Sequence, residues 1–227
     1  DVDWPITNGE QHVLQWETDL LANLGGDRMG FSATNTVGTA AVSTAMSTVL
    51  ATAILPGTFT VLESVSSLDN PWSVASERVE AAGAQLAEVL LARVHGERPV
   101  TLIGYSMGAR LIFHALLSMA EQHGNKARGL VEDAVLLGGT MSTDPEEWTK
   151  VRSVVCGRLV NGHSDRDWLL ALMYRYKSWN LSAVAGLGPV EDVRGVENVD
   201  LSRVIGSHTD YPRKMARCLQ IVGISAG

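Results

Sequence analysis

The chain has 227 residues, of which 45% are hydrophobic and 19% are charged, and this composition is typical of a globular protein with one sizeable core. Its formal net charge of −7 and the absence of a basic run argue against a nucleic-acid binder, because clustered lysine and arginine drive binding to phosphate backbones. The two cysteines, Cys156 and Cys218, lack the spacing of a metal or redox site. They indicate a reduced compartment and leave a single disulfide between them open.

The N-terminal residues have neither the basic nor the apolar region of a signal peptide, and the chain begins at Asp1 rather than at a methionine. We therefore expect a fragment or a processed product of a longer protein. The expected location is the cytoplasmic side, with membrane association through segments outside this chain.

Apolar runs with strand-like and helix-like periods alternate along the chain, which predicts an α/β protein with a mostly parallel sheet and helices on both faces. The whole chain is expected to form one domain. The pattern predicts strands over 12–16, 100–103, 133–137 and 158–161, and helices over 18–24, 77–94, 109–121, 168–173 and 212–221.

The segment 31–62 has no charged residue, although Thr, Ser and Gly dilute its hydrophobicity. We expect a helical insertion that packs on the sheet or forms a lid over the active site. A membrane-facing element is the alternative, because 37–55 is about as long as the roughly 20 residues that cross a bilayer as a helix.

The motif with the clearest chemistry is the pentapeptide Gly104-Tyr105-Ser106-Met107-Gly108, which lies between a predicted strand and a predicted helix. This context is that of a nucleophile elbow, a strained turn that exposes a serine hydroxyl. Gly104 and Gly108 lack the Cβ atoms that would collide with the neighbouring strand and helix in such a turn. The sequence therefore predicts that Ser106 is a nucleophile.

The predicted turn places Ser106 at the N-terminus of a helix, where free N–H groups and the helix dipole favour negative charge. The backbone N–H of Met107 is then the first donor of an oxyanion hole.

A serine hydroxyl needs a histidine to accept its proton and a carboxylate to fix the histidine tautomer. In this fold the acid and then the histidine follow the serine along the chain. Among the six histidines, His208 lies in a loop before the last predicted helix, as expected for the base. Asp165 and Asp167 both follow the strand 158–161, and we favour Asp167 because the longer loop can turn back over the strand end.

Further motifs occur from Gln15 to the C-terminus. They are Trp16-Glu17, Asp69-Asn70-Pro71-Trp72, the residues 98–110 around the pentapeptide, 131–138, Glu147-Trp148, 151–161, Asp167-Trp168 and Glu197-Asn198-Val199-Asp200. With these motifs the chain resembles the family of α/β-hydrolases that includes the transmembrane and coiled-coil domain-containing proteins.

The resemblance implies an α/β-hydrolase fold and a triad of Ser106, Asp167 and His208, with Tyr211 closing a Gly-x-His-x-x-Tyr motif. Members of the family usually carry, ahead of the residue that matches Trp4, a strand that resembles the one supplying the second oxyanion donor. This strand is absent from the chain.

The leading functional hypothesis is hydrolysis of an ester, with a lipid-like acyl substrate favoured, through an acyl-enzyme and without a cofactor or metal. The expected partners are a small-molecule or lipid ester and a membrane surface, and no nucleic acid; the sequence does not identify a protein partner. The alternative is a non-catalytic interaction or membrane-trafficking module on the same scaffold.

Overall fold

The computed structural model describes residues 10–16, 77–177 and 184–224. The chain divides into two compact units, one comprising 1–11 and 79–227 and the other 12–78. Residues 10–16 form neither helix nor strand, so the strand predicted over 12–16 is wrong. The helix predicted over 18–24 and the insertion predicted over 31–62 lie outside the described residues.

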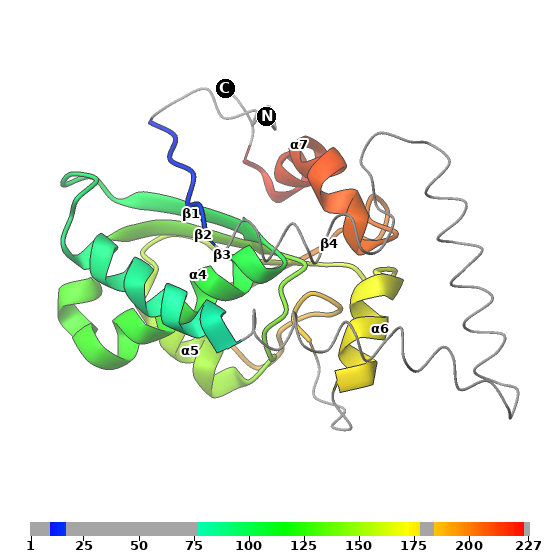
Figure 1. The fold of residues 1–227 in the computed structure, drawn as a ribbon, viewed down its shortest axis with the longest axis horizontal. Coiled ribbons are helices and arrows are strands. Elements are labelled where there is room, and N and C mark those ends of the chain that lie inside the picture. The colour runs from blue at the N-terminus through cyan, green and yellow to red at the C-terminus, as the bar shows by residue number, and fades with distance from the viewer. Residues whose placement is uncertain (1–9, 17–76, 178–183, 225–227) are drawn as a thin grey trace, which may run out of the picture. The chain divides into compact units, whose positions relative to one another are not determined.

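The central feature of the larger unit is a four-stranded parallel sheet with the strand order β1-β2-β3-β4 (Figure 1). The strands are β1 (Val100–Tyr105), β2 (Val131–Leu137), β3 (Leu159–His163) and β4 (Val196–Asp200). Because neighbouring strands run in the same direction, each connection between them must cross over the sheet. All carboxyl ends of these strands therefore meet at one edge.

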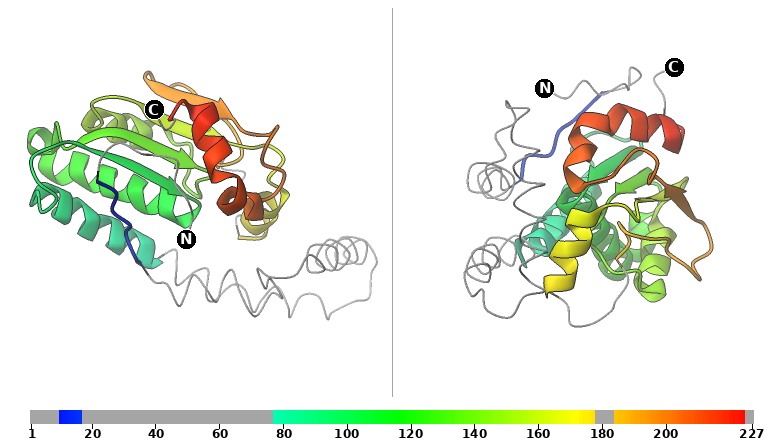
Figure 2. Two further views of the ribbon diagram at one scale, coloured as in Figure 1. Left: turned by 90° about the horizontal axis from the view of Figure 1, so that it is seen from above. Right: turned by 90° about the vertical axis from the view of Figure 1, so that its right-hand side faces the viewer.

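Helices cover both faces of the sheet. They are α4 (Met107–Ser118), α5 (Pro145–Val154) and α7 (Tyr211–Val222), besides a helix described over 77–91, while α6 (Trp168–Lys177) contacts the 3-10 turn over 208–210. The 77–91 helix, α4 and α5 lie on one face and α7 lies on the other (Figure 2). The predicted fold class, a parallel α/β sheet covered on both faces, is confirmed for the described residues.

The alternation of side chains along β2 divides the core between the two faces. Ala134 and Leu136 pack with α4 and α5, whereas Val135 and Leu137 pack with α7. All four are fully buried. A strand that is buried on both faces has a nearly continuous run of apolar residues. This explains why the sequence predicted a strand at β2.

Short helical turns connect some of these elements. A π-helical turn, Met119–His123, and a 3-10 turn, Gly124–Ala127, continue α4 toward β2. A 3-10 turn, His208–Asp210, leads into α7, which ends at Gly223 in the left-handed conformation (φ 83°). Within the described ranges, no helix is long and apolar enough to cross a membrane.

Two elements were not predicted. Helix α5 buries only Trp148, Val151 and Val154, a narrow stripe, and Asp144 caps it by accepting a hydrogen bond from the Glu146 N–H (2.9 Å). Strand β4 has the sequence Val-Glu-Asn-Val-Asp, and its side chains are exposed or half-buried. A polar strand at the end of the described sheet lacks the apolar run on which strand prediction depends.

Candidate active site

The three residues predicted to act together come from three different segments. Ser106 directly follows β1, Asp167 lies in the loop between β3 and α6, and His208 precedes α7. In open α/β sheets, ligands bind outside the carboxyl ends of the strands. The structure brings the three side chains together at that edge.

The backbone at Ser106 has a conformation that L-residues rarely adopt, with φ 55° and ψ −125°. Its N–H donates to the Leu137 carbonyl (2.9 Å), and its carbonyl accepts from the Arg110 N–H (3.1 Å). The residue thus ends the β1–β2 ladder and starts α4. Backbone strain of this kind costs about 1–3 kcal/mol and is typical of functional turns.

The expected crowding at the elbow glycines is found at Gly104. A Cβ there would lie 2.8 Å from backbone atoms of Gly108 and from Ile112 Cδ1, so strand and helix could not approach as closely. At Gly108 itself, a Cβ would meet no atom of the described part of the chain within 4 Å. The prediction that a Cβ at Gly108 would collide is therefore wrong. It is the backbone of Gly108 that a Cβ at Gly104 would meet.

The N-terminus of α4 offers backbone donors beside the serine. Met107 and Gly108 precede Arg110, whose N–H makes a helical hydrogen bond to Ser106, and the first N–H groups of a helix have no intrahelical acceptor. Met107 is 4% exposed, and the Thr140 hydroxyl donates to its sulfur (3.4 Å). The side chain is thereby fixed on the interior side.

His208 bridges the serine and the aspartate. Its Nε2 lies 2.6 Å from the Ser106 Oγ, and its Nδ1 lies 2.6 Å from the Asp167 Oδ2. A carboxylate can only accept, so Nδ1 carries the hydrogen and Nε2 is the acceptor for the serine hydroxyl. This arrangement can remove a proton from the hydroxyl.

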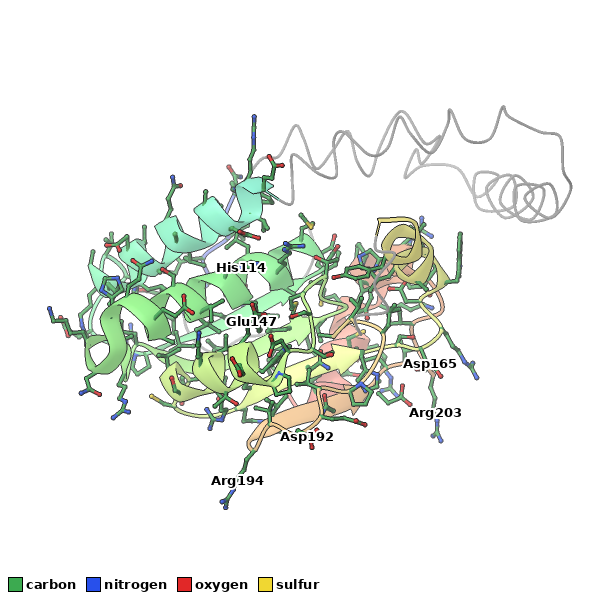
Figure 3. The ribbon with its side chains drawn as sticks, turned by 90° about the horizontal axis from the view of Figure 1, so that it is seen from below. His114, Glu147, Asp165, Asp192, Arg194 and Arg203 are labelled. Carbon is green, nitrogen blue, oxygen red and sulfur yellow. The ribbon has the colours of Figure 1, made fainter. Side chains whose placement is uncertain are left out.

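Asp167 is fully buried, whereas the imidazole of His208 is 11% exposed. The second carboxylate oxygen of Asp167 accepts from the Leu170 N–H (3.1 Å), at the start of α6. Asp167 therefore both contacts the histidine and caps the first turn of α6. Asp165 is exposed and lies beyond the strand ends (Figure 3), so of the two predicted acids only Asp167 meets His208.

The loop that carries His208 is held by charged side chains. The Asp210 carboxylate accepts from the Gly206 N–H (2.9 Å) and from the Lys214 ammonium (3.0 Å). Lys214 also donates to the Val204 carbonyl (2.8 Å). Burial raises the pKa of Asp210, but the hydrogen bond from Gly206 and the positive charge of Lys214 outweigh it, and the net pKa is lowered.

Tyr211 is a fully buried ring beside the histidine. Its centroid lies 5.6 Å from that of His208 at a steep angle and 6.1 Å from that of Tyr105 in a stacked arrangement. Gly138, at φ 53°, leaves the space that the ring occupies. Among the described residues the hydroxyl of Tyr211 has no hydrogen-bond partner, and burial, together with the charge of Asp167, raises its pKa.

The other histidines that follow Ser106 lie elsewhere. His114 lies on α4 (Figure 3) near Glu80, and burial and the positive charge of Arg110 lower its pKa. His123 lies 3.2 Å from Glu88, and burial lowers the pKa of His163 at the end of β3. Of the described histidines, it is His208 that contacts the serine.

Sequence reasoning missed the residues that support the site from behind. Ser164 joins the aspartate loop to the histidine loop, and Gly186 lies against the backbone of Gly138 and Gly139. The sequence Ala185-Gly186-Leu187-Gly188 does not reveal which of its two glycines packs against another backbone. Nothing in the sequence marks Ser164, because its partner carbonyl belongs to a residue 41 positions away.

The described residues contain no group of three or more His, Cys, Asp and Glu side chains that could hold a metal ion. Cys156 and Cys218 are both free, one exposed and one buried, so they do not form the disulfide that the sequence left open. Burial raises the pKa of Cys218 to about 11.

Fold and site together define an α/β protein in which a serine, a histidine and an aspartate form a hydrogen-bonded row at the carboxyl edge of a parallel sheet. The chain belongs to the family described as "Protein of unknown function (DUF726)", which matches residues 4–225. No solved structure matches the chain.

Three curated relatives illustrate the family. The chain is 41% identical over 222 residues to an uncharacterized membrane protein of Caenorhabditis elegans, covering 96% of this chain and 35% of the relative. It is 35% identical over 224 residues to a probable lipase of Saccharomyces cerevisiae, covering 96% of this chain and 20% of the relative. It is 39% identical over 208 residues to a transmembrane and coiled-coil domain-containing protein of Oryza sativa, covering 90% of this chain and 31% of the relative. The chain thus spans about a third or less of the length of these relatives.

Proposed function

We propose that this chain is a serine hydrolase domain of the α/β-hydrolase fold that cleaves an ester through an acyl-enzyme. In this proposal Ser106 is the nucleophile, His208 is the general base and acid, and Asp167 orients His208. The observation that carries the proposal is the unbroken row of two 2.6 Å contacts that leads from a fully buried carboxylate to the serine hydroxyl. A histidine held in this way has the tautomer and orientation that activation of a serine requires.

The reaction proceeds in two steps. Ser106 Oγ attacks the carbonyl carbon of the ester while its proton moves to His208 Nε2, and His208 then gives that proton to the leaving alcohol as the ester C–O bond breaks. Water attacks the acyl-enzyme in the same manner, with His208 taking a proton from water and returning it to Ser106 as the acid leaves. Asp167 stabilises the charged imidazole in both steps.

The negative charge that develops on the carbonyl oxygen needs donors that are already in place. In the proposal the Met107 N–H is one such donor, because it lies at the free N-terminus of α4 next to the nucleophile. Each donor of this kind contributes about 3 kcal/mol of transition-state stabilisation.

The favoured substrate is an ester with a lipid-like acyl chain. Support comes from the name of the yeast relative, a probable lipase, of which this chain covers 20%. The uncharged segment 31–62, with its many apolar residues, would suit contact with such a chain. Relatives described as membrane proteins support a location at a membrane, to which segments outside this chain would hold it.

The competing hypothesis is a non-catalytic interaction or membrane-trafficking module, and the names of the membrane-protein relatives are compatible with it. The strained φ of Ser106 and the buried carboxylate favour the enzyme, because a module without chemistry has no use for either. The two hypotheses differ in whether the chain turns over an ester.

The test is hydrolysis of p-nitrophenyl esters of increasing acyl length by the wild-type chain, Ser106→Ala and Ser153→Ala. The control serine, Ser153, lies on α5 and donates to the Lys150 carbonyl, so its loss should leave turnover unchanged. We expect turnover that rises from acetyl to longer acyl chains and that Ser106→Ala abolishes. Hydrolysis that Ser106→Ala leaves intact would refute the proposal, and preference for the acetyl ester would refute the lipid-like substrate.

A further inference from the structure

Ser164 is a fully buried polar residue between the end of β3 and Asp167. Its hydroxyl donates to the Ile205 carbonyl (2.7 Å) and accepts from the Arg166 N–H (3.2 Å). Its own N–H donates to the Gly186 carbonyl (3.0 Å), and its carbonyl accepts from the Asp167 N–H (3.3 Å). Every polar group of the residue is therefore engaged, as burial requires.

These contacts join the two loops that supply the acid and the base. Ser164 lies three positions before Asp167, and Ile205 lies three positions before His208. The hydrogen bond between Ser164 and Ile205 therefore joins the two loops three residues before Asp167 and His208, which contact each other. Two backbone donors also join these segments, but at residues farther from His208: Leu201 N–H to the His163 carbonyl (2.8 Å) and Asp165 N–H to Ser202 Oγ (3.1 Å).

The side chains that shape the histidine loop do not replace this link. Asp210 and Lys214 bind Gly206 and Val204, which belong to the same stretch of chain. They fix the form of the loop but not its distance from the aspartate. Among the hydrogen bonds of described side chains outside the catalytic row, that of Ser164 joins the loop of the acid to the histidine loop at the position nearest His208 in the sequence.

We propose that Ser164 is a positioning residue, whose hydroxyl sets the separation and orientation of Asp167 and His208. The proposal rests on the proposed hydrolase function. A misplacement of about 1 Å in a catalytic group can lower a rate about 100-fold, so a side chain that fixes the distance between two loops has a measurable effect on kcat. Because Ser164 touches neither the substrate nor the serine in this account, KM should not change.

The experiment compares Ser164→Ala with Ser164→Thr, which keeps a hydroxyl, and with Ser202→Ala as the matched control. Ser202 accepts from a backbone N–H of the same loop, but at Asp165. We expect Ser164→Ala to lower kcat about 10- to 100-fold at unchanged KM, Ser164→Thr to recover part of it, and Ser202→Ala to match the wild type. If Ser164→Ala does not fold, Ser164→Cys, which keeps the shape of the side chain and weakens the donor, takes its place.

A second readout needs no substrate. In the whole chain labelled with ¹⁵N-histidine, the proton on His208 Nδ1 should give a far-downfield resonance, because it lies in a short hydrogen bond to a carboxylate. We expect Ser164→Ala to shift or lose this resonance and Ser202→Ala to keep it. An unchanged resonance in Ser164→Ala overturns the proposal, whatever happens to kcat, as does a wild-type kcat in that variant. An inactive wild type would refute the hydrolase function, while the resonance would still decide the role of Ser164.

Discussion

Replacement of Asp167 by asparagine tests the proposed row of catalytic groups at its buried end. The two side chains have nearly the same shape, and the asparagine oxygen can still accept from the Leu170 N–H, so helix α6 keeps its start. The amide nitrogen then faces His208 Nδ1 at the position of Oδ2. Because an amide N–H donates, Nδ1 must become the acceptor, and the hydrogen moves to Nε2.

The change of tautomer removes the base. Nε2 lies 2.6 Å from Ser106 Oγ and could then only donate to the serine, which would keep its proton. An equivalent change in serine proteases lowers kcat about 10⁴-fold, and we expect a loss of the same order here. That loss corresponds to about 5.5 kcal/mol of transition-state stabilisation.

The assay is kcat for a p-nitrophenyl ester, with urea denaturation to establish that each variant is folded. Asp165→Asn is the matched control, because this second acidic residue of the same loop is exposed and has no contact with His208. We expect wild-type kcat for the control. An Asp167→Asn variant that keeps more than a tenth of the wild-type kcat, or a control that falls equally, would refute the reasoning.

Two predictions concern residues packed behind the site. Gly186→Ala should lower the free energy of unfolding by about 2 kcal/mol, because its Cβ would lie 2.6–2.8 Å from backbone atoms of Gly138 and Gly139. Urea denaturation measures this, with Gly188→Ala as the control. Equal stability of the two variants would contradict the close packing at Gly186. Tyr211→Phe should raise the free energy of unfolding by about 1 kcal/mol, because it removes a buried hydroxyl that has no partner in the described part of the chain. A lower thermal midpoint for this variant than for the wild type would mean that the hydroxyl has a partner.

The parts of the site that the sequence predicted depend on local signals. Ser106 could be placed because an apolar strand, the pentapeptide and a helix follow one another without interruption, and the structure has β1 and α4 at those positions. His208 followed from chain order and from its place before the last helix, where α7 begins. Asp167 was separated from Asp165 by loop length, and in the structure it is Asp167 that contacts His208.

The remaining parts depend on contacts between distant segments, for which one sequence holds no signal. Ser164 is an ordinary polar residue until β3 and the chain after β4 come together and bring it to Ile205. The need for glycine at 186 arises only because the backbone at Gly138 and Gly139 lies against it. Strand β4 escaped prediction for a related reason, since its polar pattern is favourable only beside β3, with which it pairs in parallel.

The central claim is that Ser106 has an activated hydroxyl, and covalent modification measures this directly. A fluorophosphonate reacts with an activated serine and leaves a phosphonyl adduct whose mass identifies the modified peptide. We expect one adduct, on the peptide that contains Ser106, formed by the wild-type chain and absent from both Ser106→Ala and heat-denatured protein. A folded wild-type chain that forms no adduct, or one modified at another serine, would contradict it.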